Sequence, residues 1–205
     1  MKIIVFGATG GVGRQVVRQA LEAGFDVTAF VRNPAKLDVA HERLRVVQGD
    51  AFNREQVSAA IAGHDAVVSC LGSSRGLKPS TELQEMVRCI AEGMREHGVR
   101  RIVYTASAGI DREIPGISGK LIMYLLRHPL ADHRAAVGLI RQHGLIYTIV
   151  RPLGLNDRPF TGRYREAAYG VPPKAMSIPR ADVAHFIVNA LRDHRYVNTS
   201  VGITT

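Results

Sequence analysis

The first thirteen residues, MKIIVFGATGGVG, constrain the fold more than any other stretch of the chain. Lys2 to Phe6 form a short apolar run rich in β-branched residues, which is typical of a strand buried on both faces. Gly7, Gly10 and Gly13 follow directly at three-residue spacing. Glycines at such a turn allow a sharp bend, a close approach to a phosphate and tight packing of the next helix, whose free N–H groups attract anions. This stretch therefore predicts a strand, a turn and a helix that together cradle the pyrophosphate of a dinucleotide.

The spacing G-x-x-G-x-x-G is a variant of the dinucleotide fingerprint G-x-G-x-x-G, so its interpretation depends on the surrounding sequence. An amphipathic segment, Val12 to Ala23, follows the glycines, and a second apolar strand, Phe25 to Val31, comes after the turn signal at Gly24. Together they complete a βαβ unit of about thirty residues. The alternative is that the glycines only mark a turn. The context favours a cofactor site.

The residues after the second strand bear on which dinucleotide binds. In NAD enzymes an acidic residue about 20 positions past the glycines bonds the ribose 2′-hydroxyl, whereas an arginine there accommodates a 2′-phosphate. Arg32 lies 19 positions past Gly13, and Lys36 follows one helical turn later. The pattern predicts that NADP(H) is preferred over NAD(H). The alternative is that Arg32 is a solvated surface residue.

Strands alternate with helices along the rest of the chain. Further strands are expected at 44–48, 66–70, 101–106, 145–150 and 199–204, with helices at 53–62, 79–97, 131–143 and 178–192. This alternation predicts an α/β fold, a doubly wound parallel Rossmann sheet in the order 3-2-1-4-5-6 with helices on both faces and room for an extra C-terminal strand. We expect one domain over residues 1–205, with loops around 109–129 and 153–176 facing the substrate. The first of these segments is expected to cover the mouth of the site as a lid or a short helix.

Several residues at the predicted carboxyl ends of strands are candidates for ligand contact, because open α/β sheets bind their ligands at that edge. Asp50 suits a contact to the adenine, although a role as the N-cap of the next helix is also open. Leu71 and Gly72 end the fourth strand, where the topological switch point is expected. Ser107 ends the fifth strand and is the best single candidate for a substrate contact.

Composition excludes several function classes. The net charge of +9 favours anionic ligands, but the basic residues are scattered, so we expect no specific nucleic-acid partner. Cys70 and Cys89 have neither metal-ligand nor redox spacing, and no metal site is expected. No apolar stretch approaches the roughly 18 residues of a membrane span, and no leader precedes the first strand. We expect a soluble cytoplasmic protein without a membrane partner, as a monomer or a small homo-oligomer.

The motifs GATGGVG, VRNPAKL, HDAVVSCLGS, YTASAG, GLIYTIVRP, NDRPFTGRY and IPRADVAHF occur in one order along nearly the whole chain. Together they resemble the atypical short-chain dehydrogenases with an NAD(P)H-binding, NmrA-like domain, and most closely the flavin reductase or biliverdin-IXβ reductase type. The glycine motif and IPRADVAHF are shared widely in that superfamily. The stretch GLIYTIVRPLGLNDRPFTGRY is more specific to the flavin-reductase-like branch.

The resemblance implies functional residues at matching positions. It implies NADP(H) binding by Gly7, Thr9, Gly10, Gly11, Val12, Gly13, Arg32, Lys36, Asp50, Ala51, Leu71 and Gly72. Residues at the ends of the later strands are added as cofactor candidates, namely Ser73, Thr105, Arg151 and Pro152. It further places Ser107 near the nicotinamide and His133 near the substrate as catalytic candidates. A second histidine of some relatives is replaced here by Gly154, so its role does not carry over.

The chain lacks the Tyr-x-x-x-Lys pair that serves typical short-chain dehydrogenases as proton donor, since no tyrosine is followed by lysine four positions later. Tyr124 with His128 imitates the spacing, but the surrounding LIMYLLRHP is more typical of packing. Hydride transfer to a flat, conjugated acceptor needs less acid assistance, because the acceptor delocalises the arriving charge. The sequence therefore favours an oxidoreductase, an NADPH-dependent reductase of a flavin, tetrapyrrole or quinone-like small molecule.

Two alternatives remain open, a non-catalytic regulator that senses NADP(H) and a sugar-epimerase-like enzyme that retains its nicotinamide. Four arginines near the expected mouth of the site either attract propionate or phosphate groups of a substrate or are solvated surface charges. These are Arg75, Arg151, Arg158 and Arg163.

Overall fold

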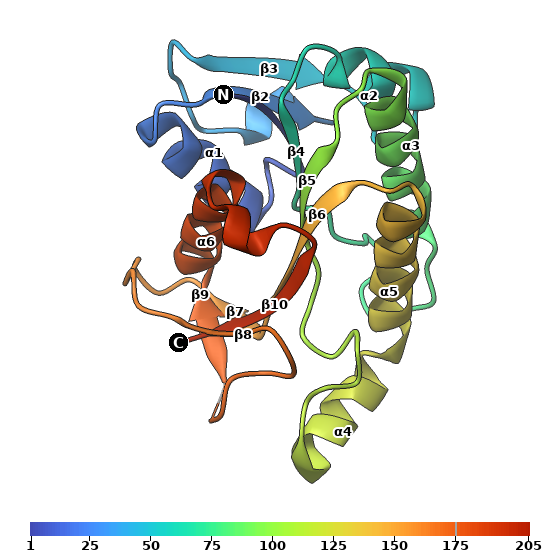
Figure 1. Ribbon diagram of the computed structural model, residues 1–205, viewed down its shortest axis with the longest axis vertical. Helices are drawn as coiled ribbons and strands as arrows, with labels where there is room; N and C mark the ends of the chain where they lie inside the picture. Colours follow the sequence, from blue (N-terminus) through green and yellow to red (C-terminus); the bar gives the residue numbers. More distant parts are fainter. Residues whose placement is uncertain (175) are drawn as a thin grey trace.

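A computed structural model describes residues 1–174 and 176–205 and shows an eight-stranded sheet flanked by helices (Figure 1). The strands run in the order β3-β2-β1-β4-β5-β6-β10-β8, and β7 pairs with β9 in a separate two-stranded sheet. The strands are β1 (Lys2–Phe6), β2 (Asp26–Val31), β3 (Leu44–Gln48), β4 (Ala66–Ser69), β5 (Arg101–Thr105), β6 (Ile146–Pro152), β7 (Gly154–Asn156), β8 (Arg165–Ala167), β9 (Ser177–Pro179) and β10 (Thr199–Thr204). The helices are α1 (Gly11–Glu22), α2 (Arg54–Ile61), α3 (Glu82–Glu96), α4 (Gly116–Leu125), α5 (Arg127–Gln142) and α6 (Arg180–Arg192), with 3₁₀ turns at Pro34–Lys36 and His194–Tyr196.

The predicted parallel order 3-2-1-4-5-6 is confirmed, and the sheet extends further. β10 pairs parallel with β6, and β8 pairs antiparallel with β10. The central strand β1 is buried on both faces, since Ile3, Ile4, Val5 and Phe6 have no exposed surface. A run of apolar residues without alternation is what a strand covered on both sides requires.

Helices cover both faces of this sheet. α1 packs against α6 over one apolar cluster, whereas α2, α3 and α5 pack in sequence over the other (Figure 1). The stripe of α3 that includes Leu83, Val87, Ile90 and Met94 is buried in the second cluster, as its helical spacing predicts. The strand ends and the loops after them are therefore the free edge of the sheet, where a ligand can approach.

The segment 153–176, predicted as irregular, contains regular structure, and the segment 109–129, predicted as a lid or a short helix, contains a helix. Residues 153–176 include the short strands β7 and β8, and residues 109–129 include the helix α4. The helix α5 begins at Arg127, earlier than the predicted start at Ala131, because Pro129 lies in the first turn, where a missing N–H breaks no intrahelical bond. Three-residue strands and a proline-bearing first turn carry too little periodicity to be found from sequence.

The alternative role of Asp50 as a helix N-cap is wrong. Asn53 is the N-cap of α2, and its side-chain oxygen accepts a hydrogen bond from the Gln56 N–H at 3.0 Å. The Asp50 carboxylate instead accepts from the Phe52 N–H at 3.1 Å, within the loop that follows β3. It therefore holds the backbone of this loop at the edge of the sheet.

Candidate active site

The glycine turn after β1 has a geometry that only glycine satisfies. Gly7 adopts a left-handed conformation with φ of +77°, and a Cβ there would lie 2.5 Å from the carbonyl oxygen of Cys70 at the end of β4. A Cβ on Gly13 would lie 2.2 Å from the carbonyl oxygen of Gly7. The turn is closed by the N–H of Gly10, which donates to the Gly7 carbonyl at 2.9 Å. The three glycines thus bring β1, β4 and α1 into contact and leave backbone groups open above the turn.

A cavity of about 240 Å³ lies beside this turn, at the carboxyl ends of β1, β2 and β3. Its lining includes predicted cofactor residues from four separate segments, namely Gly7, Thr9, Gly10, Arg32, Asp50, Ala51, Leu71 and Gly72. It also includes residues that the sequence analysis missed, namely Phe30, Val31, Gly49, Phe52, Cys70, Ser74, Glu82 and Met86. Phe30 and Met86 lie on the apolar stripes of β2 and α3, so their spacing indicates only core, whereas Phe52 lies in the loop after β3.

A larger cavity of about 1050 Å³ adjoins the first and shares Cys70, Leu71 and Gly72 with it. It lies over the ends of β4, β5 and β6 and is closed on its far side by α4 and by the segment before β9. Its lining includes further predicted residues, namely Gly11, Val12, Thr105, Ser107, His133 and Pro152. The two cavities form a continuous path along the sheet edge, from Arg32 at one end to Ser107 at the other.

Four predicted cofactor residues line neither cavity. Gly13 lies under the glycine turn, Lys36 is exposed beside the loop after β2, and the Ser73 hydroxyl donates to the Glu82 carboxylate at 3.0 Å. The fourth, Arg151, is buried behind the site. Gly13 therefore shapes the turn, and Ser73 joins the loop after β4 to the start of α3.

The position predicted for Arg151 at the mouth of the site is wrong. Its side chain is only 2% exposed and forms an ion pair with Glu113, which is 7% exposed. The guanidinium also donates to the Ser200 hydroxyl at 2.9 Å and to the Gly170 carbonyl at 3.1 Å. Because these partners occupy it, Arg151 holds the loop after β5 against β10 and is not free to meet an anion in either cavity.

The three other arginines predicted near the mouth also lie outside both cavities. Arg75 pairs with Glu82 at 3.5 Å, while Arg158 and Arg163 are exposed. A different arginine, Arg180 at the start of α6, lines the larger cavity. It was missed because its motif, IPRADVAHF, indicates from sequence only the start of a helix.

Arg180 lies directly across the glycine turn. A Cβ on Gly11 would come 2.5 Å from the Cδ atom of Arg180, so the absence of a side chain at Gly11 makes room for it. The guanidinium is 28% exposed and pairs with Asp157 at 2.7 Å. A cation so placed beside the free N–H groups of the turn adds to the attraction for a phosphate.

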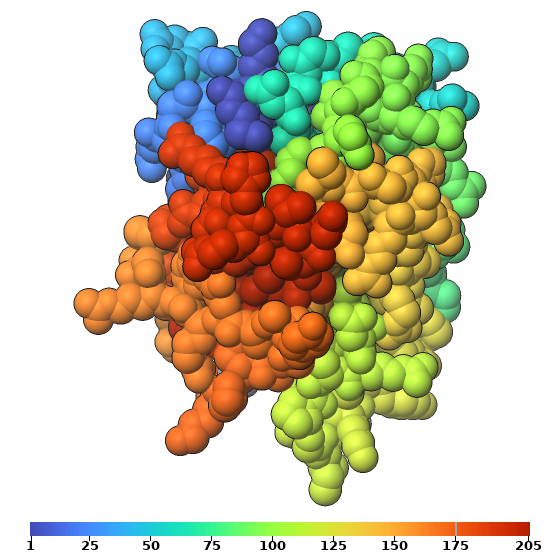
Figure 2. Space-filling view, in the orientation of Figure 1, coloured from blue at the N-terminus to red at the C-terminus, as the bar shows by residue number. Residues whose placement is uncertain are grey.

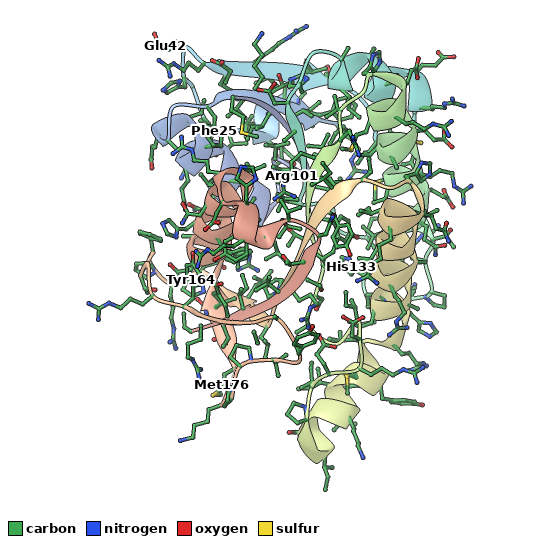
Figure 3. The ribbon with its side chains drawn as sticks, viewed as in Figure 1. Phe25, Glu42, Arg101, His133, Tyr164 and Met176 are labelled. Carbon is green, nitrogen blue, oxygen red and sulfur yellow. The ribbon has the colours of Figure 1, made fainter. Side chains whose placement is uncertain are left out.

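The two catalytic candidates lie in the larger cavity. The Ser107 hydroxyl donates to the Ala108 carbonyl at 3.2 Å. The imidazole of His133, which Figure 3 labels beside α5, lies 2.8 Å from the Tyr104 hydroxyl through its Nδ1 atom. Burial lowers the pKa of His133 to about 4 and raises the pKa of the Tyr104 hydroxyl. His133 is therefore neutral at pH 7 and acts as a hydrogen-bonding group, not as a cationic acid.

The carboxylate beside His133 has a structural task. Asp132 is 1% exposed, and its two oxygens accept hydrogen bonds from the Leu83 and Gln84 N–H groups, both at 3.1 Å. These are free donors in the first turn of α3, so Asp132 caps that helix from α5. The resulting α3–α5 contact fixes the position from which His133 faces the cavity.

Tyr124 and His128 lie away from the larger cavity. They line a separate hollow on the outer side of α4 and α5, and the Tyr124 side chain is 63% exposed with the Arg127 guanidinium 4.6 Å from its ring centre. The expectation that Tyr124 packs in the interior is wrong. Its position outside the cavity agrees with the prediction that this pair does not replace a Tyr-x-x-x-Lys motif.

The pKa values of both cysteine thiols are raised. Burial raises the pKa of the Cys70 thiol to about 12, which leaves it protonated at neutral pH, and burial also raises the pKa of Cys89. Among the residues that the structure describes, no group of three or more His, Cys, Asp or Glu side chains is arranged to hold a metal ion. No helix in that part of the chain combines the length and apolar character needed to cross a membrane.

Comparison with known proteins assigns the family. The model of a family described as NAD(P)H-binding matches residues 7–194. This chain belongs to that NAD(P)H-binding family. Its fold and sequence place it among the atypical short-chain dehydrogenases and reductases, in agreement with the resemblance drawn from its motifs.

Individual relatives of this NAD(P)H-binding protein include reductases. It is 34% identical over 190 residues to dihydroflavonol 4-reductase of Zea mays, covering 73% of this chain and 51% of the relative. It is 30% identical over 196 residues to (4-alkanoyl-5-oxo-2,5-dihydrofuran-3-yl)methyl phosphate reductase of Streptomyces griseus, covering 92% of this chain and 62% of the relative. The chain spans about half to three-fifths of the length of these curated relatives.

Solved structures share the fold across the whole chain. A short-chain dehydrogenase/reductase of Veillonella parvula in complex with NADP has a TM-score of 0.82 at 21% identity, with 100% of this chain and 94% of that one covered. An anaerobilin reductase of Escherichia coli O157:H7 has a TM-score of 0.80 at 20% identity, with 100% and 97% covered. The NAD(P)H-binding protein thus has the Rossmann fold that its motifs predict.

Proposed function

We propose that the chain is an NADPH-dependent reductase that transfers hydride to a flat, conjugated acceptor such as a flavin, a tetrapyrrole or a quinone-like molecule. The observation that carries the proposal is the pair of adjoining cavities at the sheet edge. The first cavity is lined by the glycine turn and Arg32, and the second, of about 1050 Å³, is lined by Ser107 and His133. Two of the curated relatives are named as reductases, which supports the same class of reaction.

The glycine turn after β1 fits a dinucleotide pyrophosphate. A Cβ on Gly7 or Gly13 would collide with backbone, so the turn is built for a close approach, and Arg180 lies across it. When bound, NADPH supplies the hydride. Thr9, Gly10 and Gly11 offer the turn to the pyrophosphate, while Arg32, at the far end of the smaller cavity, meets the ribose 2′-phosphate.

The larger cavity holds the acceptor against the reactive ring. Its floor is made by Leu71 and Gly72 at the end of β4, which allow a flat molecule to lie close to the strand ends. The Ser107 hydroxyl offers a hydrogen bond at the acceptor's edge. His133 is neutral and adds a second hydrogen-bonding group, so the final proton comes from solvent rather than from a strongly acidic side chain.

We expect Arg32→Ala to weaken NADPH binding by about 10- to 100-fold, because a charge-assisted hydrogen bond contributes about 1.5–3 kcal/mol. Asp38, in the loop after β2, lines neither cavity and is paired with Arg14 and Arg18, at 3.2 and 2.9 Å. Calorimetric titration of NADPH and NADH against the wild type and the variant measures the effect. NADH affinity should be unchanged, as should both affinities in the control variant Arg45→Ala.

Equal affinities of the wild type for NADPH and NADH would contradict the role of Arg32. A loss of NADPH affinity in Arg45→Ala of the same size as in Arg32→Ala would show that general surface charge, and not a specific phosphate contact, is measured. Arg45 is exposed on β3 and lines neither cavity, so it matches Arg32 in charge but not in position.

We expect Ser107→Ala to lower kcat by about 10-fold while the affinity for NADPH changes by less than about twofold, as a lost transition-state hydrogen bond of about 1.5 kcal/mol implies. Ser118→Ala is the matched control, since Ser118 lines the same cavity from α4. Steady-state kinetics with a saturating acceptor separates the two. Unchanged kinetics in Ser107→Ala would remove this hydroxyl from the reaction.

A regulator that binds NADP(H) without turnover is the second candidate. It is favoured by the residues that the structure describes around the larger cavity, which include no strong acid, since His133 is neutral and the Tyr-x-x-x-Lys pair is missing. The same absence counts against an epimerase that retains its nicotinamide, because removing a proton from a sugar alcohol needs a strong base. Turnover with any planar acceptor separates the reductase from the regulator.

A further inference from the structure

The helix α4 (Gly116–Leu125) projects from one end of the molecule (Figures 1 and 2). Its inner side, at Gly119 and Met123, packs toward the body of the protein. Its outer side is apolar and exposed, with Ile117 at 88% and Leu121 at 59%, and with Tyr124 and Leu125 also more than half exposed. At 3.6 residues per turn these four side chains fall within an arc of about 100°, the width of a stripe that normally packs against something.

A cationic hollow of about 620 Å³ borders this apolar stripe. It is lined by four full cations and a histidine, namely Arg112, Lys120, Arg127, His128 and Arg134. Over residues 1–174 and 176–205, no carboxylate lines the hollow, and no ion pair forms to any of these four cations. The hollow is therefore complementary to anions and sits directly beside exposed apolar side chains.

We propose that α4 and the cationic hollow dock the protein onto an anionic lipid surface. The stripe formed by Ile117, Leu121 and Leu125 would lie at the boundary of the headgroups and acyl chains, and the hollow would hold lipid phosphates. No membrane partner is expected from the sequence, because no segment is long enough to span a bilayer, but a helix that lies on the surface does not need that length.

The charge around α4 argues against a second copy of the chain as the occupant. A two-fold contact between α4 stripes would set Lys120 and Arg127 of one copy near the same cations of the other, which costs free energy. The net charge of +9 acts in the same direction, since it repels another copy and attracts a negative surface.

The inner edge of α4 also forms a wall of the larger cavity, through Ser118, Gly119 and Ile122. Across the cavity lies Met176, which lines it and is 83% exposed at the same end of the molecule (Figure 3). Docking through α4 would therefore set the mouth of the cavity at the lipid surface. Resting on the proposed function, this favours a lipophilic acceptor, such as a quinone-like molecule dissolved in the bilayer.

The test is flotation of the purified full-length protein with phosphatidylcholine vesicles that contain or lack phosphatidylglycerol. We expect binding to the anionic vesicles only, and its loss at about 1 M salt, where the Debye length is about 3 Å. The variant Lys120→Ala should bind about fivefold more weakly, since each basic residue near an anionic surface contributes about 1 kcal/mol. The double variant Ile117→Ser with Leu121→Ser should bind the anionic vesicles at least about tenfold more weakly.

Matched controls are Arg88→Ala, an exposed cation on α3, and Leu77→Ser, an exposed apolar residue in the loop before α3. Neither should change vesicle binding. Failure of the wild type to bind anionic vesicles, or equal losses in the controls, would overturn the proposal. A wild type that is dimeric in light scattering, with a monomeric Ile117→Ser, Leu121→Ser variant, would also overturn the proposal, because α4 would then be a contact between copies.

Turnover gives a separate readout. With NADPH and a lipophilic quinone, anionic vesicles should raise the rate of the wild type and not that of the double variant, while the rate with FMN in solution stays equal in both. Vesicle binding without turnover of any acceptor would contradict the proposed function and leave the docking proposal intact. Turnover without vesicle binding would contradict the docking proposal and leave the proposed function intact.

Discussion

The variant Glu113→Ala is expected to lose about 3–5 kcal/mol of unfolding free energy, because it leaves the guanidinium of Arg151 buried without its counter-charge. Glu113 also accepts hydrogen bonds from the Gly109 and Asp111 N–H groups at 3.0 and 2.9 Å, so the loop after β5 loses its internal anchor as well. Urea unfolding at pH 7, followed by circular dichroism, measures the loss. An exposed pair provides the scale, since Glu42→Ala next to Arg43 should cost less than about 0.5 kcal/mol.

A second variant distinguishes an unpaired charge from a lost contact. If the cost comes from the isolated guanidinium, the double variant Glu113→Leu with Arg151→Met should recover most of the stability, as replacement of a buried ion pair by apolar residues often does. A double variant as unstable as Glu113→Ala would mean that the hydrogen bonds of this loop, rather than the buried charge, set the stability.

The variant Gly7→Ala is expected to lose about 2–5 kcal/mol of unfolding free energy. It is also expected to show no measurable binding of NADPH. Two costs add, a left-handed conformation at about 1–2 kcal/mol and overpacking at about 1–3 kcal/mol, since the new Cβ would lie 2.5 Å from the Cys70 carbonyl oxygen. Urea unfolding and calorimetric titration of NADPH measure the two effects. Relief of the collision requires movement of the β4 end, which carries Leu71 and Gly72 in both cavities.

Gly63 provides the matched control for this variant. It has a similar φ of +75°, but a Cβ there would meet nothing within 4 Å. Gly63→Ala should therefore cost only the left-handed conformation, about 1–2 kcal/mol, and leave NADPH binding unchanged. Equal effects of the two variants would show that the close approach of the glycine turn to β4 has no role in the cofactor site.

The sequence was sufficient for the parallel sheet order and for the positions that the two cavities bring together. Buried parallel strands appear in the sequence as unbroken apolar runs, and their carboxyl ends share one edge of the sheet. Arg32, Asp50, Gly72 and Ser107 could therefore be placed on that edge from the sequence alone. The NADP(H) preference and the catalytic roles of Ser107 and His133 stay predictions until a ligand is bound.

Other features could not be predicted, because they depend on contacts between residues far apart in the chain. Arg151 lies at the carboxyl end of β6, but its burial is decided by Glu113 in the loop after β5 and by Ser200 on β10, both distant from it in sequence. Arg180 depends on the lack of a side chain at Gly11. The exposed stripe of α4 has apolar residues at helical spacing, which on sequence alone is the signature of core.

Turnover of NADPH by this chain is measured by the rate of NADPH oxidation with FMN, a linear tetrapyrrole and a quinone as acceptors. We expect oxidation with at least one planar acceptor, at a lower rate with NADH and at a lower rate in Ser107→Ala. Tight binding of NADPH with no oxidation by any of these acceptors would contradict this expectation and identify the protein as a sensor of NADP(H).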